Sequence, residues 1–391
     1  MSRDRPVRIL QSVGAMNHGG IEHFLMNLYR GINRDLVQFD FIERVNGPAI
    51  FDEEIASLGG RIFHCASPDK HPIRAMRYYR SFFRKHPEYS VVHEHRSSLL
   101  GFMGCLTAAS YENVSTRIIH AHNSSPVRSG AARAAEMASD SFNKRRVKKF
   151  ATDYFACSDA AKAWMFPVST GVSDKVKVIP NGIDTKRFRF DNRNRSDIRR
   201  EFKIPQHAFV IGHVGRFDCA KNQSFLLDIL ASFPEEDRPV LLLLGDGALR
   251  VPLEERACSM GLEGNVVFAG MQNETNRFYS AMDIFCMPSL YEGLPVSAVE
   301  AQANGLPLLL SDGISRDTDL GGGVEFKALS DGPMLWAEVL SEQLKSVGLT
   351  DRAEGVTRVV EAGFDIGETA NTLQDFYIDR STLAMKMNAN G

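Results

Sequence analysis

The chain has 391 residues, of which 43% are hydrophobic and 24% charged, a composition typical of globular proteins and too apolar for a disordered one. Its 46 basic and 48 acidic side chains give a net charge of −2, which excludes a general electrostatic attraction to nucleic acid or anionic lipid. No apolar run reaches the roughly 20 residues that span a bilayer, and the six cysteines form no C-x-x-C pair, so we expect a cytoplasmic protein without a transmembrane span or a disulfide framework.

Short apolar runs alternate with longer amphipathic stretches along the chain. In the first half, helical spacing over Glu22–Arg30 and Ile73–Lys85 lies between runs that predict strands at Val7–Val13, Phe39–Ile42, Arg61–His64, Val91–His93, Arg117–His120, Tyr154–Cys157 and Val176–Ile179. In the second half, strands are predicted at Val210–Val214, Val240–Leu244, Val266–Ala269, Ile284–Met287, Leu308–Ser311 and Gly323–Phe326. Strands that alternate with helices predict right-handed βαβ crossovers and parallel sheets.

Thirteen strands are too many for one ordinary doubly wound sheet, so we predict an α/β fold with two Rossmann-like parallel-sheet domains facing across a cleft. The domains are expected over residues 1–187 and 188–370, with a terminal helix and tail over 371–391 that can pack back on the first domain. The polar stretch Phe188–Arg200 is interpreted as a linker, Ile366–Tyr377 as a helix and Ser381–Gly391 as a frayed tail. Ligands of such sheets bind at the carboxyl ends of the strands.

The first candidate site follows the first predicted strand. Gly19 and Gly20 stand between that strand and a helix, so the backbone N–H groups at the helix N-terminus could be approached closely by an anion. A plain strand–helix turn explains this pattern equally well, because both the GxGxxG fingerprint and the P-loop sequence are missing.

The second candidate is a pair of cations after the strand Val210–Val214. Arg216 ends the strand and Lys221 follows five residues later, near the start of the next helix. An arginine that can bind two oxygens and a lysine that acts as a point charge suit a diphosphate. Two solvated surface charges are the alternative.

The third candidate is the segment Asp283–Pro307. Glu292 lies in the loop after a strand, Pro295 is expected as the first residue of a helix, and Glu300 lies between one and two turns into it. The two carboxylates are therefore predicted to reach one cleft, where they can accept hydrogen bonds from sugar hydroxyls. The N–H groups near Leu294–Val296 can bind a phosphate at the positive end of the helix dipole. Stabilisation of the dipole by acidic residues is the structural alternative for either glutamate alone.

The spacing Glu292-x7-Glu300, within PSLYEGLPVSAVEAQANGLP, resembles the E-x7-E signature of the family-4 retaining glycosyltransferases. Other segments match this family in the expected order: the GGIEH loop, Ile179–Asp184, Gly215–Lys221, Leu244–Gly247 and Phe268–Gly270. The sequence is most similar to the enzymes of bacterial exopolysaccharide and capsule synthesis. The resemblance implies the GT-B fold, with an N-terminal acceptor-side domain and a C-terminal domain that binds a nucleotide-sugar donor.

The resemblance also implies roles for individual residues. Arg216 and Lys221 would hold the donor diphosphate, which Gly19 and Gly20 would border from the other domain. Glu292, with Gly293, Leu294 and Pro295 beside it, would lie near the hydroxyls of the transferred sugar. Glu300 would accept hydrogen bonds from the ribose, and the segment around Met271 would contact the base through its backbone.

Histidines cluster at two predicted strand ends of the first domain. In the family a histidine after such a strand contacts the transferred sugar, and counting from the strand favours His122. His120, two residues earlier, and His95 in the segment VHEH are candidates for the acceptor side. H-x-H spacing also suits a metal, but no clustered carboxylate or cysteine accompanies it, and GT-B enzymes need no divalent metal as a class. We therefore expect no metal and no cofactor.

We predict a retaining glycosyltransferase of the hexosyltransferase type that moves a sugar from a nucleotide-diphosphate donor, expected to be UDP-linked, to a hydroxyl of a glycan or lipid-linked acceptor in polysaccharide biosynthesis. A sugar-nucleotide epimerase or phosphorylase on the same fold, or a catalytically silent binding subunit, is the alternative. The basic segments Lys70–His86 and Lys144–Lys149 suit either contact with a membrane surface, on its cytoplasmic side, or ordinary solvated helix faces. Nucleic acid is not an expected partner.

Overall fold

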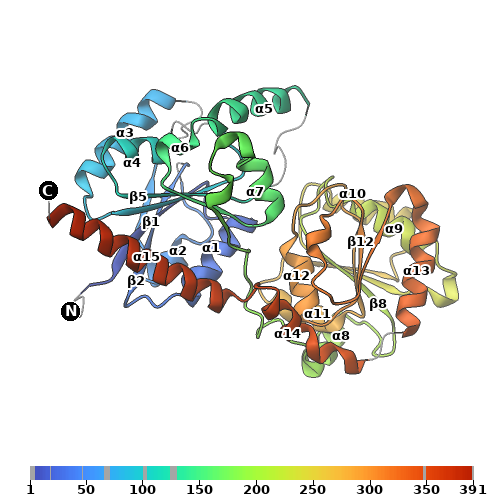
Figure 1. Ribbon diagram of the computed structural model, residues 1–391. Helices are drawn as coiled ribbons and strands as arrows, with labels where there is room; N and C mark the ends of the chain where they lie inside the picture. Colours follow the sequence, from blue (N-terminus) through green and yellow to red (C-terminus); the bar gives the residue numbers. More distant parts are fainter. Residues whose placement is uncertain are drawn as a thin grey trace. The chain divides into compact units, whose positions relative to one another are not determined.

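The structure is a computed structural model that describes residues 5–17, 19–45, 47–65, 71–99, 104–123, 130–346 and 349–389. The chain divides into two compact units, the first formed by Met1–Gly182 with Ile366–Gly391 and the second by Ile183–Asp365 (Figure 1). Both divisions lie five residues before the expected domain boundaries at 187/188 and 370/371. The terminal helix belongs to the first unit.

The first unit is built on a seven-stranded parallel sheet in the order β3-β2-β1-β4-β5-β6-β7. Its strands are β1 (Val7–Val13), β2 (Val37–Glu43), β3 (Ile62–His64), β4 (Val91–Arg96), β5 (Thr116–Ala121), β6 (Asp153–Ala156) and β7 (Val176–Val178). Its helices are α1 (Gly20–Gly31), α2 (Asp52–Ser57), α3 (Pro72–Lys85), α4 (Cys105–Tyr111), α5 (Gly130–Lys144), α6 (Val147–Phe150), α7 (Asp159–Met165) and α15 (Ile366–Ala389).

Helices cover both faces of this sheet. Helices α3, α4, α6 and α7 pack on one face through a single hydrophobic cluster, and α1, α2 and α15 pack on the other through a second cluster (Figure 1). Because the sheet is covered on both sides, successive side chains of its central strands contribute alternately to the two clusters. Ile9 and Ile118, for example, face α1 and α15, while Leu10 and Ile119 face the opposite layer.

The second unit repeats this plan with a six-stranded parallel sheet in the order β10-β9-β8-β11-β12-β13. Its strands are β8 (Val210–Val214), β9 (Val240–Leu244), β10 (Val266–Gly270), β11 (Ile284–Met287), β12 (Leu308–Ser311) and β13 (Val324–Lys327). Its helices are α8 (Asn192–Glu201), α9 (Gln223–Ala231), α10 (Arg250–Ser259), α11 (Thr275–Ala281), α12 (Val296–Ala303), α13 (Gly332–Ser346) and α14 (Gly355–Glu361). Helices α9, α10 and α13 share one hydrophobic cluster with the sheet, and α8, α11, α12 and α14 share the other.

The predicted pair of Rossmann-like parallel-sheet domains is therefore confirmed. The thirteen strands of the described residues occupy the thirteen predicted runs, with ends that differ by at most three residues. Within the described part of the chain, no helix combines the length and the apolar character needed to cross a bilayer.

The interpretation of Phe188–Arg200 as a linker is wrong, because most of this stretch forms helix α8. The Asp191 side chain caps the helix by accepting hydrogen bonds from the backbone N–H groups of the next turn. Arg199 is fully buried, and its guanidinium donates a 2.8 Å hydrogen bond to the carboxylate of Asp283. The polar composition of the segment therefore reflects a buried ion pair in addition to exposed residues.

The prediction of a frayed tail after Ser381 is also wrong, since α15 continues to Ala389. Leu373 and Tyr377 are buried in the cluster shared with α1, and Ser381 and Ala384 are buried one and two turns further on. This packing holds the helix beyond its strongly apolar part.

We predict that Leu373→Ala, which removes a side chain with 1% of its surface exposed, lowers the free energy of unfolding of the first unit by about 2–4 kcal/mol. Leu383→Ala, on the same helix but at a side chain that is 51% exposed, is the matched control and should stay within about 0.5 kcal/mol of the wild type. Urea denaturation followed by circular dichroism measures both. Equal effects of the two substitutions would show that α15 does not close this face of the sheet.

Candidate functional site

Arg216, Lys221 and the segment Glu292–Pro295 lie in two loops that follow neighbouring strands of the second unit. In its sheet the chain order reverses between the adjacent strands β8 and β11. Loop 215–222 follows β8 and loop 288–295 follows β11. Ligands of open α/β sheets bind at such a point, outside the carboxyl ends of the strands.

Two hydrogen bonds tie these loops together. The backbone N–H of Leu290 donates to the carbonyl of Ala220 at 2.8 Å, and the side-chain amide of Asn222 donates to the carbonyl of Pro288 at 3.1 Å. Asn222 has φ 55°, a left-handed conformation that asparagine tolerates better than most residues. The position of one loop therefore determines the position of the other.

Lys221 and Glu292 form an ion pair between the two loops. The ammonium Nζ lies 2.6 Å from the Glu292 Oε1, and the two side chains are 17% and 22% exposed. In this half-buried setting the attraction is screened less than it is at an open surface, but both groups remain accessible to a ligand. The pair brings together two of the residues that the sequence singled out.

The backbone on either side of Glu292 is also fixed. Its N–H donates to the carbonyl of Gly313, and its own carbonyl accepts from the N–H of Ser315. A side chain at position 313 would clash with the carbonyl of Leu290, so the chain can approach this closely only with glycine there. The Glu292 carboxylate is thus held by backbone contacts as well as by Lys221.

Arg216 lies two residues after β8 and is exposed. Its carbonyl accepts a 2.8 Å hydrogen bond from the side-chain amide of Gln223, at the start of α9. The neighbouring loop after β9 contains Gly245, with φ +128°, where a Cβ would clash with the carbonyl of Gly215. Gly245, the first glycine of the LGDG segment, therefore allows the backbones of these two loops to approach closely.

Helix α12 begins one residue later than expected. Pro295 is the residue that precedes the helix, with φ −71° and ψ 120°, and Val296 is the first helical residue. A proline has no side-chain acceptor, and no side chain caps this helix. Gly293 and Leu294, which are half-buried, lead into this N-terminus. The positive end of the helix therefore lies directly after Glu292 in the chain.

Glu300 lies in the second turn of α12, and its carboxylate Oε2 accepts a 2.7 Å hydrogen bond from the hydroxyl of Tyr279. Desolvation raises the pKa of Glu300 to about 7, against the lowering effects of Tyr279 and of the charge on Arg187. Tyr279 is fully buried on α11 and was not predicted as a site residue. Its only sequence signal is a tyrosine in the apolar stripe of a helix, where a buried hydroxyl needs a partner.

Met271 follows β10 and is exposed, consistent with a position where the backbone rather than the side chain would meet a ligand. The loop that contains it is held by the side chain of Gln272, which donates a 2.6 Å hydrogen bond to the carbonyl of Ala269.

Gly19 and Gly20 lie at the N-terminus of α1 in the first unit. Gly19 precedes the helix in an extended conformation, and no side chain caps the helix. A Cβ on Gly19 would clash with the carboxylate of Glu22, which lies in the first turn. An anion that borders Gly19 would therefore meet a carboxylate as well as the helix N-terminus.

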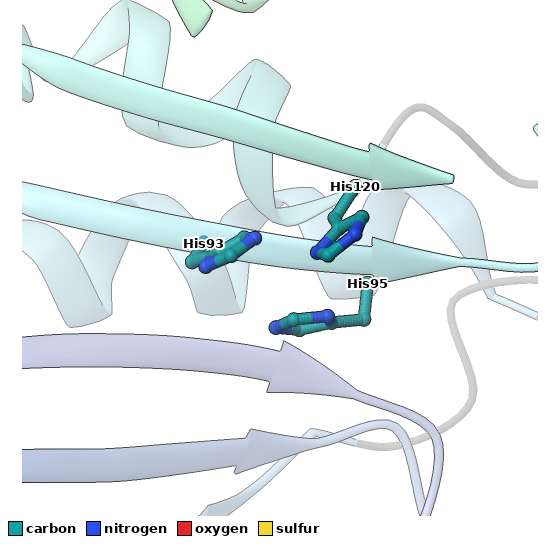
Figure 2. A group of neighbouring side chains, drawn as sticks. All are labelled: His93, His95 and His120. Carbon is teal, nitrogen blue, oxygen red and sulfur yellow. The ribbon is translucent and has the colours of Figure 1, made fainter. Parts of the chain in front are cut away.

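Four histidines of the first unit gather on the face of the sheet that α1 and α15 cover. His93 and His95 lie on β4 and His120 on β5 (Figure 2), and His122 follows β5 directly. The ring centroids of His93 and His95 are 4.2 Å apart, and those of His120 and His122 are 4.1 Å apart. The four rings therefore form one cluster.

His95 and His120 are fully buried, so the acceptor contact expected for them is not available to their side chains in this structure. Their alternation along β4 and β5 directs them into the space under α1, where Phe24 packs against both. His122 lies just beyond the strand and is partly exposed. Desolvation lowers the pKa of His122 to about 3, so its ring is neutral at pH 7.

His93, His95 and His120 each offer a ring nitrogen within 4.8 Å of the other two, a spacing that could hold a metal ion. Both ring nitrogens of His95 already have partners, Gln11 and His122. An ion in this group would have to displace one of them and would bury its charge among neutral ligands. An enzyme without an essential metal therefore stays our prediction.

Comparison with known proteins identifies the family. Residues 18–187 match Glycosyltransferase Family 4, and residues 194–316 match Glycosyl transferases group 1. The chain is 35% identical over 373 residues to the "Putative glycosyltransferase EpsF" of Bacillus subtilis (strain 168), which covers 95% of this chain and 96% of that protein. This chain belongs to glycosyltransferase family 4.

Two further proteins are similar to this glycosyltransferase over nearly its whole length. The capsular polysaccharide biosynthesis glycosyltransferase CapH of Staphylococcus aureus is 22% identical over 386 residues, which are 96% of this chain and 99% of CapH. The crystal structure of Anabaena Alr3699/HepE in complex with UDP superposes with a TM-score of 0.75 at 17% identity, over 95% of this chain and 99% of HepE. At that identity the structural similarity establishes the fold.

Because the pKa of Glu300 is raised from 4.5 to about 7, ionisation of this carboxyl is less favourable in the folded glycosyltransferase than in the unfolded chain. Glu300 therefore contributes stability that is fully present below pH 4.5 and is lost as the pH rises through about 7.

We predict that Glu300→Gln, which keeps the acceptor for Tyr279 but cannot ionise, gains stability relative to the wild type between pH 5 and pH 8. The difference in Tm should shift by about 2 °C or more towards the variant over this range. Thermal denaturation of both proteins at the two pH values measures it, because titration of all other groups is common to both. A difference that does not change with pH would contradict the raised pKa.

Proposed function

We propose that this glycosyltransferase transfers a sugar, with retention of anomeric configuration, from a UDP-linked donor to a hydroxyl of a glycan or lipid-linked acceptor in polysaccharide biosynthesis. The observation that carries the proposal is the half-buried Lys221–Glu292 ion pair, which stands between two tied loops and directly before the uncapped N-terminus of α12. A cation and a helix N-terminus suit a diphosphate, and a carboxylate suits sugar hydroxyls.

The identity of the donor is supported by relatives. HepE has been solved in complex with UDP and with UDP-glucose. The relative CapH is named for capsular polysaccharide biosynthesis. Both proteins align with this chain over nearly its full length. A UDP-linked donor, from HepE, and polysaccharide biosynthesis, from CapH, are therefore the first possibilities to test here.

The reaction breaks the bond between the anomeric carbon of the sugar and the oxygen of the donor diphosphate, whose phosphate oxygen keeps the electron pair. The acceptor hydroxyl oxygen forms the new bond to the anomeric carbon, and its proton passes to the departing phosphate. Negative charge builds up on the diphosphate in the transition state. Arg216, Lys221 and the N-terminus of α12 stabilise that charge, and preorganised groups of this kind supply the largest part of catalysis in many enzymes.

The other predicted residues keep the roles that the family resemblance implies. Glu292, Gly293 and Leu294 bind the hydroxyls of the transferred sugar, and Pro295 fixes the entry to α12. Glu300 accepts hydrogen bonds from the ribose diol, for which an ionised carboxylate is the better acceptor. The backbone at Met271 contacts the base. In the first unit, Gly19 and Gly20 border the diphosphate and His122 contacts the sugar.

No divalent metal takes part in this proposal, because the charge on the diphosphate is balanced by side chains and a helix N-terminus. Binding of UDP, GDP, ADP and their sugars is measured by thermal shift and calorimetry, with either EDTA or Mg²⁺. A shift with UDP that is the same in both conditions is expected. A strict need for Mg²⁺, or no binding of any nucleotide, would overturn this account of the donor site.

We predict that Lys221→Ala weakens binding of UDP by about 10–100-fold, since it removes a charged hydrogen-bond donor from the diphosphate. Arg216→Ala should act in the same direction. Glu292→Gln should leave the affinity for UDP within about threefold of the wild type and reduce turnover much more, because the interaction it loses is with the sugar. Calorimetry with UDP and release of UDP from a UDP-sugar measure the two effects separately.

Arg256→Ala is the matched control for these variants, since Arg256 is an exposed cation of the same unit on α10 and pairs with Asp228. It should bind UDP and turn over like the wild type. Normal turnover of Lys221→Ala and Glu292→Gln would contradict the roles proposed for the ion pair.

We also propose that the first unit binds an anionic membrane surface on the cytoplasmic side, where a lipid-linked acceptor would be found. Both predicted basic segments have helices on one face of the sheet, since α3, in the first segment, and α6, in the second, belong to the same hydrophobic cluster (Figure 1). Lys70 lies outside the described residues. Among the described residues of the two segments, the exposed cations are Arg74, Arg77, Arg84, Lys85, Arg145, Lys148 and Lys149.

Large apolar side chains accompany these cations. Ile73 on α3 and Phe142 on α5 are exposed, as expected for residues that enter the interface between lipid headgroups and acyl chains. Arg84 pairs with Glu112 and therefore adds little net charge, whereas Lys148 and Lys149 form no ion pair that the described residues show.

We predict that the protein sediments with vesicles of phosphatidylglycerol and phosphatidylcholine, and that Lys148→Glu with Lys149→Glu lowers the bound fraction at least threefold, at about 1 kcal/mol per lost cation. Raising NaCl to about 0.5 M should have the same effect through screening. The double variant Arg189→Glu with Arg193→Glu, at exposed positions of the second unit, is the control and should bind as the wild type does. Binding that ignores both charge reversal on α6 and salt would contradict the proposed surface.

A further inference from the structure

We infer that His213 and Gln223 are positioning residues of the donor site, which together hold the backbone carbonyl of Arg216 and so place its guanidinium for the diphosphate. The inference rests on the proposed function in one respect, namely that Arg216 binds the donor diphosphate. Neither His213 nor Gln223 was predicted as a site residue from the sequence.

The two side chains lie at the two ends of the loop that carries Arg216 and Lys221. His213 is in the last turn of the chain along β8, one residue before the strand ends, and Gln223 is the first residue of α9. Only 0% and 1% of their surfaces are exposed, although Arg216 between them is exposed. Polar side chains that are buried to this extent need hydrogen-bond partners, and those of His213 and Gln223 lie in the site itself.

A continuous chain of hydrogen bonds leads from β11 to the loop. His213 Nδ1 lies 2.9 Å from the carbonyl oxygen of Cys286, on β11. His213 Nε2 lies 3.3 Å from Gln223 Nε2, and that nitrogen lies 2.8 Å from the carbonyl oxygen of Arg216. The register pairs between β8 and β11 end one residue before His213 and Cys286. Side chains therefore continue the connection between the two strands at the point where the loops of the site leave the sheet.

The carbonyls at the two ends of this chain decide where its protons lie. A carbonyl oxygen can only accept, so His213 Nδ1 carries the proton that it donates to Cys286. For the same reason the amide atom next to the Arg216 carbonyl is the nitrogen of Gln223, since the amide oxygen there would face a second acceptor. The other hydrogen of that nitrogen is donated to His213 Nε2, which is therefore bare. Gln223 Oε1 has no partner among the described residues, so the side chain is held through its nitrogen.

His213 is neutral in this arrangement. Burial lowers the pKa of His213 to about 4, against the hydrogen bond to the Cys286 carbonyl, and the charge of Lys221 lowers it further. A Cβ on Gly215 would lie 3.2 Å from His213 Nε2 and 3.3 Å from the aliphatic part of Lys221, so the loop backbone passes close to both side chains. A protonated ring would face Gln223 with a second donor and Lys221 with a second positive charge.

Gln223 closes the loop, because its side chain at the end of the loop binds the carbonyl at the start. The N–H of Asp218 donates to the same carbonyl at 3.0 Å, and the N–H of Phe217 donates to the carbonyl of Asp246 at 2.9 Å. The peptide group that follows Arg216 is thus held on both sides. This fixes the direction in which the Arg216 side chain leaves the backbone, and a small displacement of such a group weakens its contact with a ligand.

The protonation of His213 is read without a nucleotide, by ¹⁵N NMR of the full-length protein with labelled histidine. The His213 signals are assigned by their loss in His213→Gln. At pH 7 the wild type should show a neutral His213 with its proton on Nδ1. A proton on Nε2, or a doubly protonated ring, would overturn the inference.

The action of Gln223 through Arg216 is tested by binding of UDP, measured by calorimetry. Gln223→Met keeps the length of the side chain but removes both hydrogen bonds, and it should weaken binding by about fivefold or more. In the presence of Arg216→Ala, the same substitution should change the affinity by less than about twofold, because the residue through which it acts is gone. Unchanged affinity in the single variant, or equal effects in the two backgrounds, would overturn the inference.

Two substitutions of His213 separate its two hydrogen bonds. His213→Gln places an amide oxygen near the position of Nε2 and keeps an acceptor for Gln223. His213→Asn keeps a donor for Cys286 but offers Gln223 no acceptor. The affinity for UDP should stay within about threefold of the wild type in His213→Gln and fall about as far as in Gln223→Met in His213→Asn. Greater loss in His213→Gln than in His213→Asn would contradict the role given to Nε2.

Gln302→Met is the matched control for the loss of a buried amide. Gln302 is 2% exposed in the last turn of α12, and its amide nitrogen donates a 2.8 Å hydrogen bond to the carbonyl of Thr318. This variant should lower the Tm about as much as Gln223→Met and leave the affinity for UDP within about twofold of the wild type. A loss of affinity as large as that of Gln223→Met would trace the effect to stability and overturn the inference. Failure of the wild type to bind UDP would count against the proposed function, whereas the protonation of His213 would still test the hydrogen-bond chain.

Discussion

Burial of both faces of a parallel sheet is the constraint on which the rest of this structure depends. Each strand must return to the same end of the sheet through a helix, and helices must cover both faces, so the carboxyl ends of all strands of a unit meet at one edge. The hydrophobic clusters on the two sides of each sheet show this requirement directly. In the first unit the covering is completed by α15, the last helix of the chain. Residues that are far apart in sequence, such as Lys221 and Glu292, come together at the edge for this reason.

The chemistry at that edge is electrostatic. Loop 215–222 supplies cations, loop 288–295 supplies a carboxylate, and the helix that follows supplies an uncapped N-terminus. The charge of Lys221 is balanced by Glu292. A diphosphate and a sugar would give each partner a new counterpart, the ammonium beside phosphate and the carboxylate beside hydroxyls. A site organised in this way suits sugar transfer, because its fixed charges can stabilise the leaving group.

Much of the fold and of the candidate donor site could be predicted from the sequence. Thirteen apolar runs predicted thirteen strands, because alternation of strands and helices leaves a strong pattern in the positions of hydrophobic residues. The motifs around Arg216, Lys221, Glu292 and Glu300 were visible because their spacing and their place after predicted strands are local features of the sequence. The close backbone approaches that demand glycine at Gly245 and Gly313 became clear only in the structure. The errors came where polar residues are buried. Arg199 made a helix resemble a linker, and the well-packed end of α15 resembled a frayed tail, since composition does not show which charges are paired or which small residues are covered.

The sequence by itself determined the fold class, the family and the residues at the strand ends, because periodicity and short motifs are local properties. Only the tertiary structure decided how those residues are used. Tyr279 meets Glu300 across two helices, and Gln11 on β1 meets His95 on β4, contacts that depend on strand order and helix packing. The same packing placed His95 and His120 in the interior, although their spacing in the sequence is as suitable for a surface site as that of His122. Burial, which sets the pKa of Glu300 and of the histidines, is a property of the surroundings and cannot be read from the residue alone.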